Sequence, residues 1–217
     1  MRLTNVMPIS VCAALAALLF GCGHLTDSLQ SEPSLVPAAD LEARLSSAVH
    51  PEGFNYRIEA DDWTITLSSS AFETLSSYAY TLGIREHEPL YSATGRRPFD
   101  IVLSVRVKSR PLSFDSYVVL LSGVGASARL RPQAVYQSNC RYVPIDLATR
   151  EWDTSRKLRI GQQLLVTPED APGNCTFLVY DIETPSPSSQ YSLALGPAFG
   201  NKVVFFSPRR VKSMTSH

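Results

Sequence analysis

The feature that most constrains the fold is a succession of short runs rich in β-branched and aromatic residues, each bounded by Gly, Pro, Ser, Asn or Asp. Such runs predict strands, because these side chains pack well on a pleated surface and the bounding residues favour turns. The expected strands are residues 63–68, 99–108, 116–122, 127–136, 140–147, 157–166, 175–183, 190–195 and 201–206. Since no ten-residue helical repeat separates these runs, the pattern argues against a parallel sheet with crossover helices.

The segment 100–108 indicates how these strands are buried. Every second residue from Ile101 to Val107 is aliphatic, and the residues between them include Ser104 and Arg106. Because successive side chains of a strand point to opposite faces, this segment predicts a strand with one buried and one wet face. Many such strands predict an all-β fold, an antiparallel two-sheet β-sandwich of immunoglobulin-like architecture, with one or two short helices near its N-terminal side.

Residues 71–82 fit two patterns. Ser70 and Glu73 form an S-x-x-E capping box, an apolar stripe follows at helical spacing, and Gly83 stands where a helix would end. Against a helix, every second residue over 78–84 is aromatic or aliphatic, as in a strand. We predict a helix over 71–82, because two end signals agree with the stripe; a strand here would instead add a member to the sandwich.

The first 21 residues predict an export signal. Arg2 provides a basic start, and residues 9–20 form an apolar stretch of the length of a secretory core. A membrane-spanning helix needs about 20 apolar residues, so this stretch is too short for a permanent transmembrane anchor. Residues 19–22, Leu-Phe-Gly-Cys, resemble the lipobox of bacterial lipoproteins. The alternative is an ordinary signal followed by a chance cysteine.

The lipobox resemblance implies a location. In bacterial lipoproteins the signal is cut before the cysteine, which is lipidated, so Cys22 would become the anchored first residue of the mature chain. Two or three acyl chains hold a protein stably in a bilayer. An aspartate after the cysteine favours the inner membrane in enteric lipoproteins, and this chain has Gly23 there. The resemblance therefore implies the periplasmic face of the outer membrane. It covers only residues 1–22, and no family is recognised for the rest of the chain.

Composition divides the chain into four segments. Residues 1–21 are the signal peptide. Residues 22–54 are polar and contain several prolines, which predicts a lipid-anchored tether with a short helix over 40–49. Residues 55–210 hold the expected strands and form the β-sandwich domain. Residues 211–217 are a basic, flexible tail.

The cysteines predict one disulfide. Of the four in the chain, Cys12 leaves with the signal and Cys22 takes lipid, so Cys140 and Cys175 remain. An even pair in an oxidising compartment predicts a disulfide bond between them, and two buried free thiols are the alternative. A zinc or redox role is not favoured, because there is no C-x-x-C motif and no histidine near either cysteine.

Net charge excludes one class of partner. Because only Arg2 leaves with the signal, the chain from residue 22 onward carries 19 basic and 20 acidic side chains. Proteins that bind nucleic acid usually show a basic excess or a reading motif, so nucleic acid is not an expected partner. Residues 201–217 hold four basic side chains and no acid. This end either keeps the terminal strand soluble or touches anionic head groups.

Through the lipid anchor, the membrane is the first expected partner.

No catalytic residue, metal site or cofactor is predicted. Only His50 and His87 lie in or near the expected domain, so a histidine-based triad would have to use one of them. Residues 123–127, GVGAS, lack the spacing of a nucleophile elbow or of a dinucleotide fingerprint. In residues 86–89, EHEP, neighbouring side chains diverge along an extended chain, which does not favour a metal site.

The longest irregular connection, residues 83–98, is the candidate binding loop. It carries His87, Tyr91, Arg96 and Arg97. Loops of this length between strands are often functional. The two arginines could grip a phosphate or a carboxylate, and solvation of a strand end is the simpler role for them.

Together these features favour a lipid-anchored periplasmic β-sandwich protein with a non-catalytic binding or envelope-assembly role, whose partner is an envelope protein or glycan. A periplasmic hydrolase acting on glycans or esters is one alternative, because two distant carboxylates cannot be recognised in one sequence. A glycan-binding module is another, in which Trp63 or Trp152 would stack on sugars rather than pack in the core.

Overall fold

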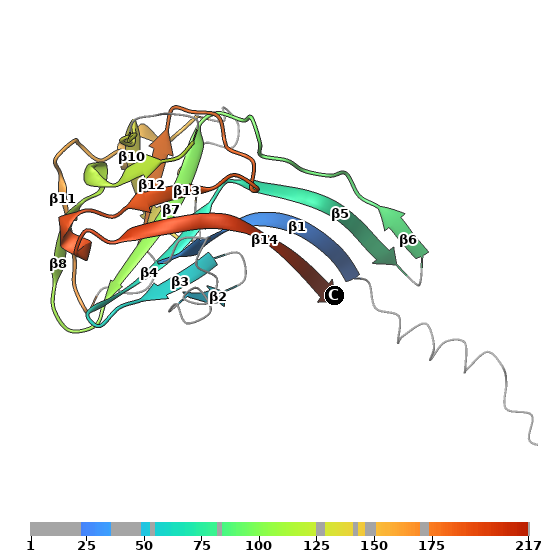
Figure 1. The fold of residues 1–217 in the computed structure, drawn as a ribbon, viewed down its shortest axis with the longest axis horizontal. Helices are drawn as coiled ribbons and strands as arrows, with labels where there is room; N and C mark the ends of the chain where they lie inside the picture. Colours follow the sequence, from blue (N-terminus) through green and yellow to red (C-terminus); the bar gives the residue numbers. More distant parts are fainter. Residues whose placement is uncertain are drawn as a thin grey trace, which may run out of the picture. The chain divides into compact units, whose positions relative to one another are not determined.

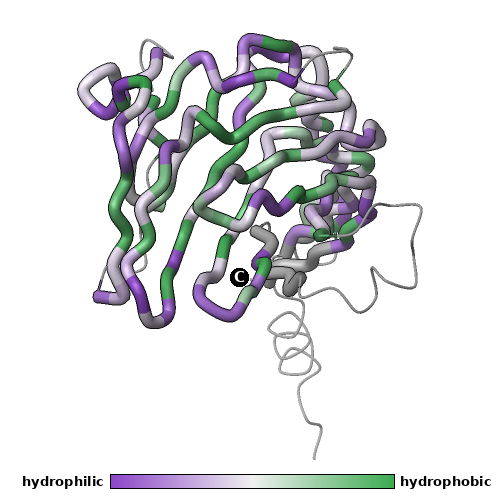
Figure 2. The backbone as a smooth tube through the Cα atoms, turned by 60° about the vertical axis from the view of Figure 1, so that its left-hand side comes forward, coloured by the Kyte–Doolittle hydropathy of each residue, from purple (hydrophilic) through white to green (hydrophobic). Residues whose placement is uncertain are grey.

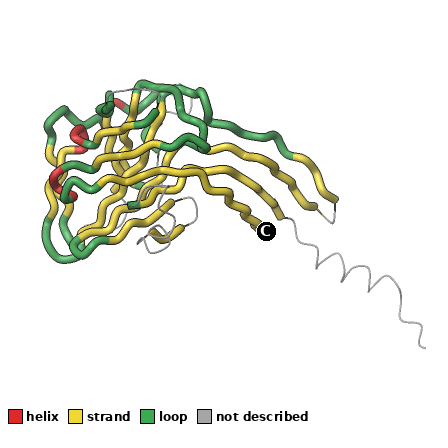
Figure 3. The backbone as a smooth tube through the Cα atoms, in the orientation of Figure 1, coloured by secondary structure: helices red, strands yellow, loops and turns green. Residues whose placement is uncertain are grey.

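The computed structural model describes residues 23–35, 49–52, 55–81, 84–124, 129–140, 143–145, 151–169 and 174–216. Over these residues the chain is all-β: its sheets are antiparallel, and the helical turns are three 3-10 turns at Ser116–Val118, Thr154–Arg156 and Pro197–Phe199 (Figure 3). No helix in this part of the chain is long and apolar enough to cross a membrane.

The strands form two six-stranded sheets and one two-stranded sheet (Figure 1). The first sheet has the order β6-β5-β1-β14-β13-β9, the second has the order β10-β12-β7-β4-β3-β2, and β11 pairs with β8. The strands are β1 Gly23–Ser34, β2 Val49–Glu52, β3 Asn55–Glu59, β4 Trp63–Ser69, β5 Phe72–Thr81, β6 Ile84–His87, β7 Phe99–Val107, β8 Leu112–Asp115, β9 Leu120–Ser122, β10 Ala134–Asn139, β11 Gln163–Val166, β12 Asn174–Tyr180, β13 Tyr191–Ala194 and β14 Val203–Ser216.

Contact density divides the chain into two compact units. The small unit comprises residues 23–29, 73–92 and 210–216, and the large unit comprises residues 30–72 and 93–209. Strands β1, β5 and β14 therefore contribute residues to both units.

The core of the large unit confirms the predicted alternation. In β7, Phe99, Ile101 and Leu103 are fully buried, whereas the residues between them are partly exposed. Figure 2 shows the alternation as hydrophobic and hydrophilic stretches along the strands. One hydrophobic cluster joins side chains from both six-stranded sheets, among them Ile58, Ile65, Leu67, Leu121, Leu178, Leu193, Val204 and Phe206. At about 25 cal/mol per Å² of buried apolar area, this cluster is the main stabilising feature of the unit.

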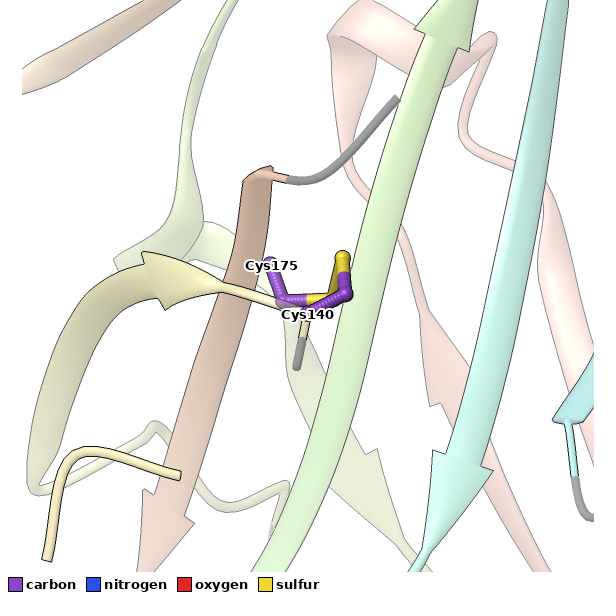
Figure 4. The surroundings of a disulfide bond; sticks show 2 residues. All are labelled: Cys140 and Cys175. Atoms are coloured by element: carbon purple, nitrogen blue, oxygen red, sulfur yellow. A yellow bond between two sulfur atoms is a disulfide. The ribbon is translucent and has the colours of Figure 1, made fainter. Parts of the chain in front are cut away.

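A second, smaller hydrophobic cluster includes Cys175, one of the two cysteines of the disulfide. Cys140 and Cys175 are bonded, with 4.9 Å between their Cα atoms, which confirms the predicted pair (Figure 4). Cys175 lies in β12, which pairs antiparallel with β10, and Ser138 of β10 lies opposite it. In the same cluster Trp152 stacks on Tyr136, with ring centroids 4.7 Å apart. Trp152 therefore packs against the sheet.

The predicted helix over 71–82 is wrong: these residues form strand β5, Phe72–Thr81. Ser70, the expected helix cap, instead accepts a hydrogen bond from the Asp100 N–H and donates one to the Asp100 carbonyl, both at 3.1 Å. Residues Tyr78–Thr81 pair with β6 in an antiparallel hairpin. The local capping signal fits a helix, but the pairing of β5 with its neighbouring strands decides the structure of this segment.

The segment boundaries also differ from those expected. Residues 23–34 of the expected tether form β1, and β2 also precedes residue 55. The expected flexible tail from residue 211 belongs to β14, which runs to Ser216. The predicted helix over 40–49 lies outside the described residues except for Val49, the first residue of β2. Polar β1 is held by contacts with distant residues, such as the hydrogen bond from Ser28 Oγ to the Val211 carbonyl.

Candidate functional site

A pocket of about 570 Å³ lies in the large unit where three turns meet: β3–β4, β7–β8 and the connection from β13 to β14. We call it the end pocket. Its walls combine aromatic, aliphatic and charged residues of both signs: Glu59, Ala60, Asp61, Asp62, Trp63, Val107, Arg110, Pro111, Leu112, Ala198, Phe199, Gly200 and Lys202.

The floor of the end pocket is aromatic. Trp63 packs edge-to-face against Phe199, with ring centroids 5.5 Å apart, and Phe199 packs in the same manner on Phe114 at 5.1 Å. Trp63 is 7% exposed and Phe199 1% exposed. Trp63 therefore packs in the core and presents little surface on which a sugar ring could stack.

The acidic side of the pocket is shaped by a tight turn over residues 60–63. The Ala60 N–H donates to the Trp63 carbonyl at 2.9 Å and closes the turn. Lys108 ties the neighbouring turn to it, because its N–H donates to the Asp62 carbonyl at 2.9 Å and its Nζ donates to the Ala60 carbonyl at 2.6 Å. Asp61 and Asp62 occupy the middle of the turn, where their carboxylates remain exposed.

The opposite side depends on two glycines around Pro197–Phe199. Gly196 has φ +87°, and a Cβ there would lie 2.9 Å from Val118 Cγ2. Gly200 caps the 3-10 turn with φ +65°, in the left-handed region that favours glycine. These two positions fix the turn that buries Phe199 and presents Lys202 at the pocket.

The charges of the end pocket are divided between its walls. Carboxylates come from the β3–β4 side, at Glu59, Asp61 and Asp62, whereas the cations Arg110 and Lys202 come from the other two turns. All of these residues except Glu59 are exposed. A groove with an apolar floor and charges of both signs suits a ligand that carries amine or guanidinium groups as well as carboxylates.

A second charged site lies in the small unit, between β1 and β14. Arg210 Nε donates to Asp27 Oδ1 at 2.8 Å and to Oδ2 at 3.0 Å. The Asp27 side chain is 11% exposed, and the Arg210 side chain is 61% exposed. The hydrogen bonds from Arg210 hold the pKa of Asp27 below its ordinary value of 3.8, and the same contact raises the pKa of Arg210.

Glu88 forms a further polar contact in the small unit. Ser77 Oγ donates to Glu88 Oε2 at 2.6 Å, and His24 Nδ1 lies 3.1 Å from Glu88 Oε1. The Ser77 hydrogen bond, followed by that of His24, lowers the pKa of Glu88. This arrangement ties the chain after β6 to the start of β1.

Comparison of the chain with protein-family models, with characterised proteins and with solved structures finds no match. Function is therefore inferred from the residues of this chain alone.

The candidate binding loop is divided between the two units. His87 and Tyr91 belong to the small unit. The His87 ring lies 4.3 Å from the ring of Tyr78, its partner in the β5–β6 register. Tyr91 is 45% exposed, and its carbonyl accepts the Thr74 N–H at 2.7 Å.

Arg96 and Arg97 belong to the large unit, where both side chains are exposed. The Arg96 carbonyl accepts the Thr184 N–H at 2.8 Å, and Arg97 Nη1 lies 3.8 Å from Asp181 Oδ1. Since Arg97 already faces a carboxylate in an exposed setting, these contacts match the simpler role of stabilising a strand end. The four residues stay a prediction as a binding site.

Asp100, which is partly exposed in β7, is the acid whose pKa is changed most clearly by desolvation. Desolvation raises the pKa of Asp100 to about 6, and a hydrogen bond from Ser70 partly opposes this increase. Asp100 lies in β7 and is not part of the end-pocket lining. Within the described residues, no group of three or more His, Cys, Asp or Glu side chains is placed to hold a metal ion.

Sequence reasoning missed the end pocket, because its residues come from three turns far apart in the chain. Two signals were available: the adjacent acids Asp61 and Asp62 between two strands, and Gly196 with Gly200 flanking a proline turn. Either signal identifies a turn. Neither reveals that the turns meet.

Proposed function

We propose that this chain is an exported bacterial lipoprotein, anchored through Cys22 to the periplasmic face of the outer membrane, whose domain binds a partner without catalysis. The domain would be a two-sheet β-sandwich of immunoglobulin-like architecture, which the shared core of the two six-stranded sheets supports. Export is supported by the lipobox resemblance and by the bonded pair Cys140–Cys175, since disulfides persist in oxidising compartments.

The end pocket is the observation that supports a binding role. A peptide segment of another envelope protein fits its chemistry best, because a peptide offers apolar side chains for the floor and charges of both signs for the walls. Its carboxylates would face Arg110 and Lys202, and its basic groups would face Asp61 and Asp62.

Photo-crosslinking in intact cells tests this proposal. A photoreactive amino acid at Asp61 is expected to capture a protein, identified by mass spectrometry of the adduct. The same group at Ile160, which is 82% exposed and outside the pocket, should capture nothing specific. The double substitution Arg110→Glu and Lys202→Glu should abolish the adduct at Asp61. Capture of a glycan, or equal adducts at both positions, would reject the peptide assignment.

The anchor requires a separate measurement. Mass spectrometry of the membrane-extracted chain should show acyl groups on an N-terminal Cys22 and loss of residues 1–21. A full-length, unprocessed chain in the cytosol with free thiols at Cys140 and Cys175 would reject the whole proposal.

A further inference from the structure

We propose that the small unit lies directly on the phospholipid surface, and that the β5–β6 hairpin contacts lipid head groups through Arg85. This inference rests on the proposed acylation of Cys22 and adds a defined membrane-facing surface to it.

The connection between Cys22 and the first strand is very short. Strand β1 begins at Gly23, the residue after Cys22. Consecutive Cα atoms lie about 3.8 Å apart, so an acylated Cys22 would hold the start of β1 within a few ångströms of the bilayer. A flexible tether would have allowed the domain to stand away from the membrane, and the sheet leaves no residues for one.

The start of β1 belongs to the same unit as the ends of other strands. Residues 23–29 belong to the small unit, together with the β5–β6 hairpin and the end of β14. Figure 1 shows the end of β14, the end of β5 and the start of β6 at the same end of this unit as the start of β1. The Asp27–Arg210 ion pair stands four residues along the strand from Gly23, about 13 Å at the usual rise. The surface nearer to the bilayer therefore includes the hairpin.

The β5–β6 hairpin carries an exposed cation. All four residues of β6 are exposed, and its first residue, Ile84, is 63% exposed. The Arg85 guanidinium lies 3.4 Å from the centroid of the Tyr78 ring. A cation held on a ring face keeps N–H donors for phosphate oxygens, and aromatic side chains favour the head-group region. Lys212 and Arg210, both exposed on β14, are further cations of the unit, and Arg210 is paired with Asp27.

The test uses the full lipidated chain reconstituted in vesicles of phosphatidylethanolamine and phosphatidylglycerol. Ile84→Cys would be labelled with an environment-sensitive fluorophore. With Cys140 and Cys175 bonded and Cys22 acylated, the new thiol is the labelled one. We expect a blue shift at position 84 and quenching by head-group nitroxide lipids. The label at Ile160→Cys, in the large unit, should show neither.

Two variants test the cause. Inserting a Gly/Ser linker of about 15 residues, with an r.m.s. length of about 20 Å, between Cys22 and Gly23 should reduce the quenching at position 84. Arg85→Glu should also reduce it, whereas Arg156→Glu, on an exposed 3-10 turn of the large unit, should not.

The failures of the two proposals are distinguishable. An acylated Cys22 with a solvent-exposed label at position 84, or quenching that the linker leaves unchanged, would overturn the membrane seating alone. A chain without acyl groups would overturn the proposed anchor and this inference together.

Discussion

The two units of this molecule bury different kinds of side chain. The large unit is organised around fully buried aliphatic and aromatic residues such as Leu103 and Phe206. None of the described residues of the small unit belongs to either hydrophobic cluster, and its buried positions include Asp27, Ser28 and Ser77.

This difference teaches how each unit is stabilised. The contribution of apolar burial grows with the buried area and does not depend on the titration of carboxylates, so the large unit should carry most of the free energy of unfolding. Hydrogen bonds and ion pairs contribute less and depend on pH and ionic strength. The small unit should therefore open first and under milder conditions.

The largest effect is expected in the core of the large unit. Leu103→Ala removes a fully buried side chain and should lower the free energy of unfolding by about 2–5 kcal/mol, as measured by denaturant titration. The matched change Leu165→Ala, at a residue that is 65% exposed, should cost about 0.5 kcal/mol or less. Equal losses for the two variants would show that burial in the core does not determine the stability of the large unit.

Removing the disulfide comes next. The double variant Cys140→Ala and Cys175→Ala should lose about 2–4 kcal/mol, because the unfolded chain gains conformational freedom. Reduction of the native chain by dithiothreitol should give the same loss in the same titration. The two results should agree, and a variant as stable as the native chain would show that the bond does not stabilise the large unit.

Asp100 predicts a smaller, pH-dependent effect. Its pKa is raised from 3.8 to about 6 in the folded state, so the folded chain binds more protons than the unfolded chain between these values. Stability should therefore fall as the pH rises from about 4 to 6, and the penalty should persist at higher pH.

Asp100→Asn removes this penalty and should raise stability at pH 7.5 by about 1–3 kcal/mol, with no gain at pH 3.5, as measured by calorimetry. Asp61→Asn, at an exposed carboxylate, serves as the control. A gain of the same size at both pH values would reject desolvation of the Asp100 carboxylate as the cause.

The smallest effect on global stability is expected in the small unit. Asp27→Asn weakens the contact with Arg210 and should speed amide exchange in residues 23–29 and 210–216, with little change in the large unit. Because the pKa values of Asp27 and Glu88 are lowered by their partners, native small-unit protection should be complete above about pH 4–5 and lost as the pH falls below it.

Arg156→Gln, which affects an exposed contact with Asp153, is the control for that experiment. Exchange that rises equally in both units would show that they open as one.

The sequence predicts strands correctly where apolar residues recur on one side of the strand. β4, β7, β12 and β13 were expected from the pattern, since each places aliphatic or aromatic residues on the core side. Strand β1 was not expected, because its sequence GHLTDSLQSEPS has no apolar period. Its partner Arg210 lies 183 residues away from Asp27, and no local pattern contains that information.

The error over β5 has the same physical origin. A capping box at Ser70 is a local signal, whereas the actual partner of Ser70 is Asp100, 30 residues later. The end pocket is also non-local, since it joins residues from three separate turns. Its charged residues could be located in turns from the sequence, but their meeting depends on the pairing order of the strands.

The place of β1 between β5 and β14 has a consequence for how the protein is made. Its seat in the sheet is completed by residues that are synthesised some 183 positions later. One neighbour, β5, is available early in synthesis, but the other side of β1 stays without its partner strand until the last strand of the chain has been made.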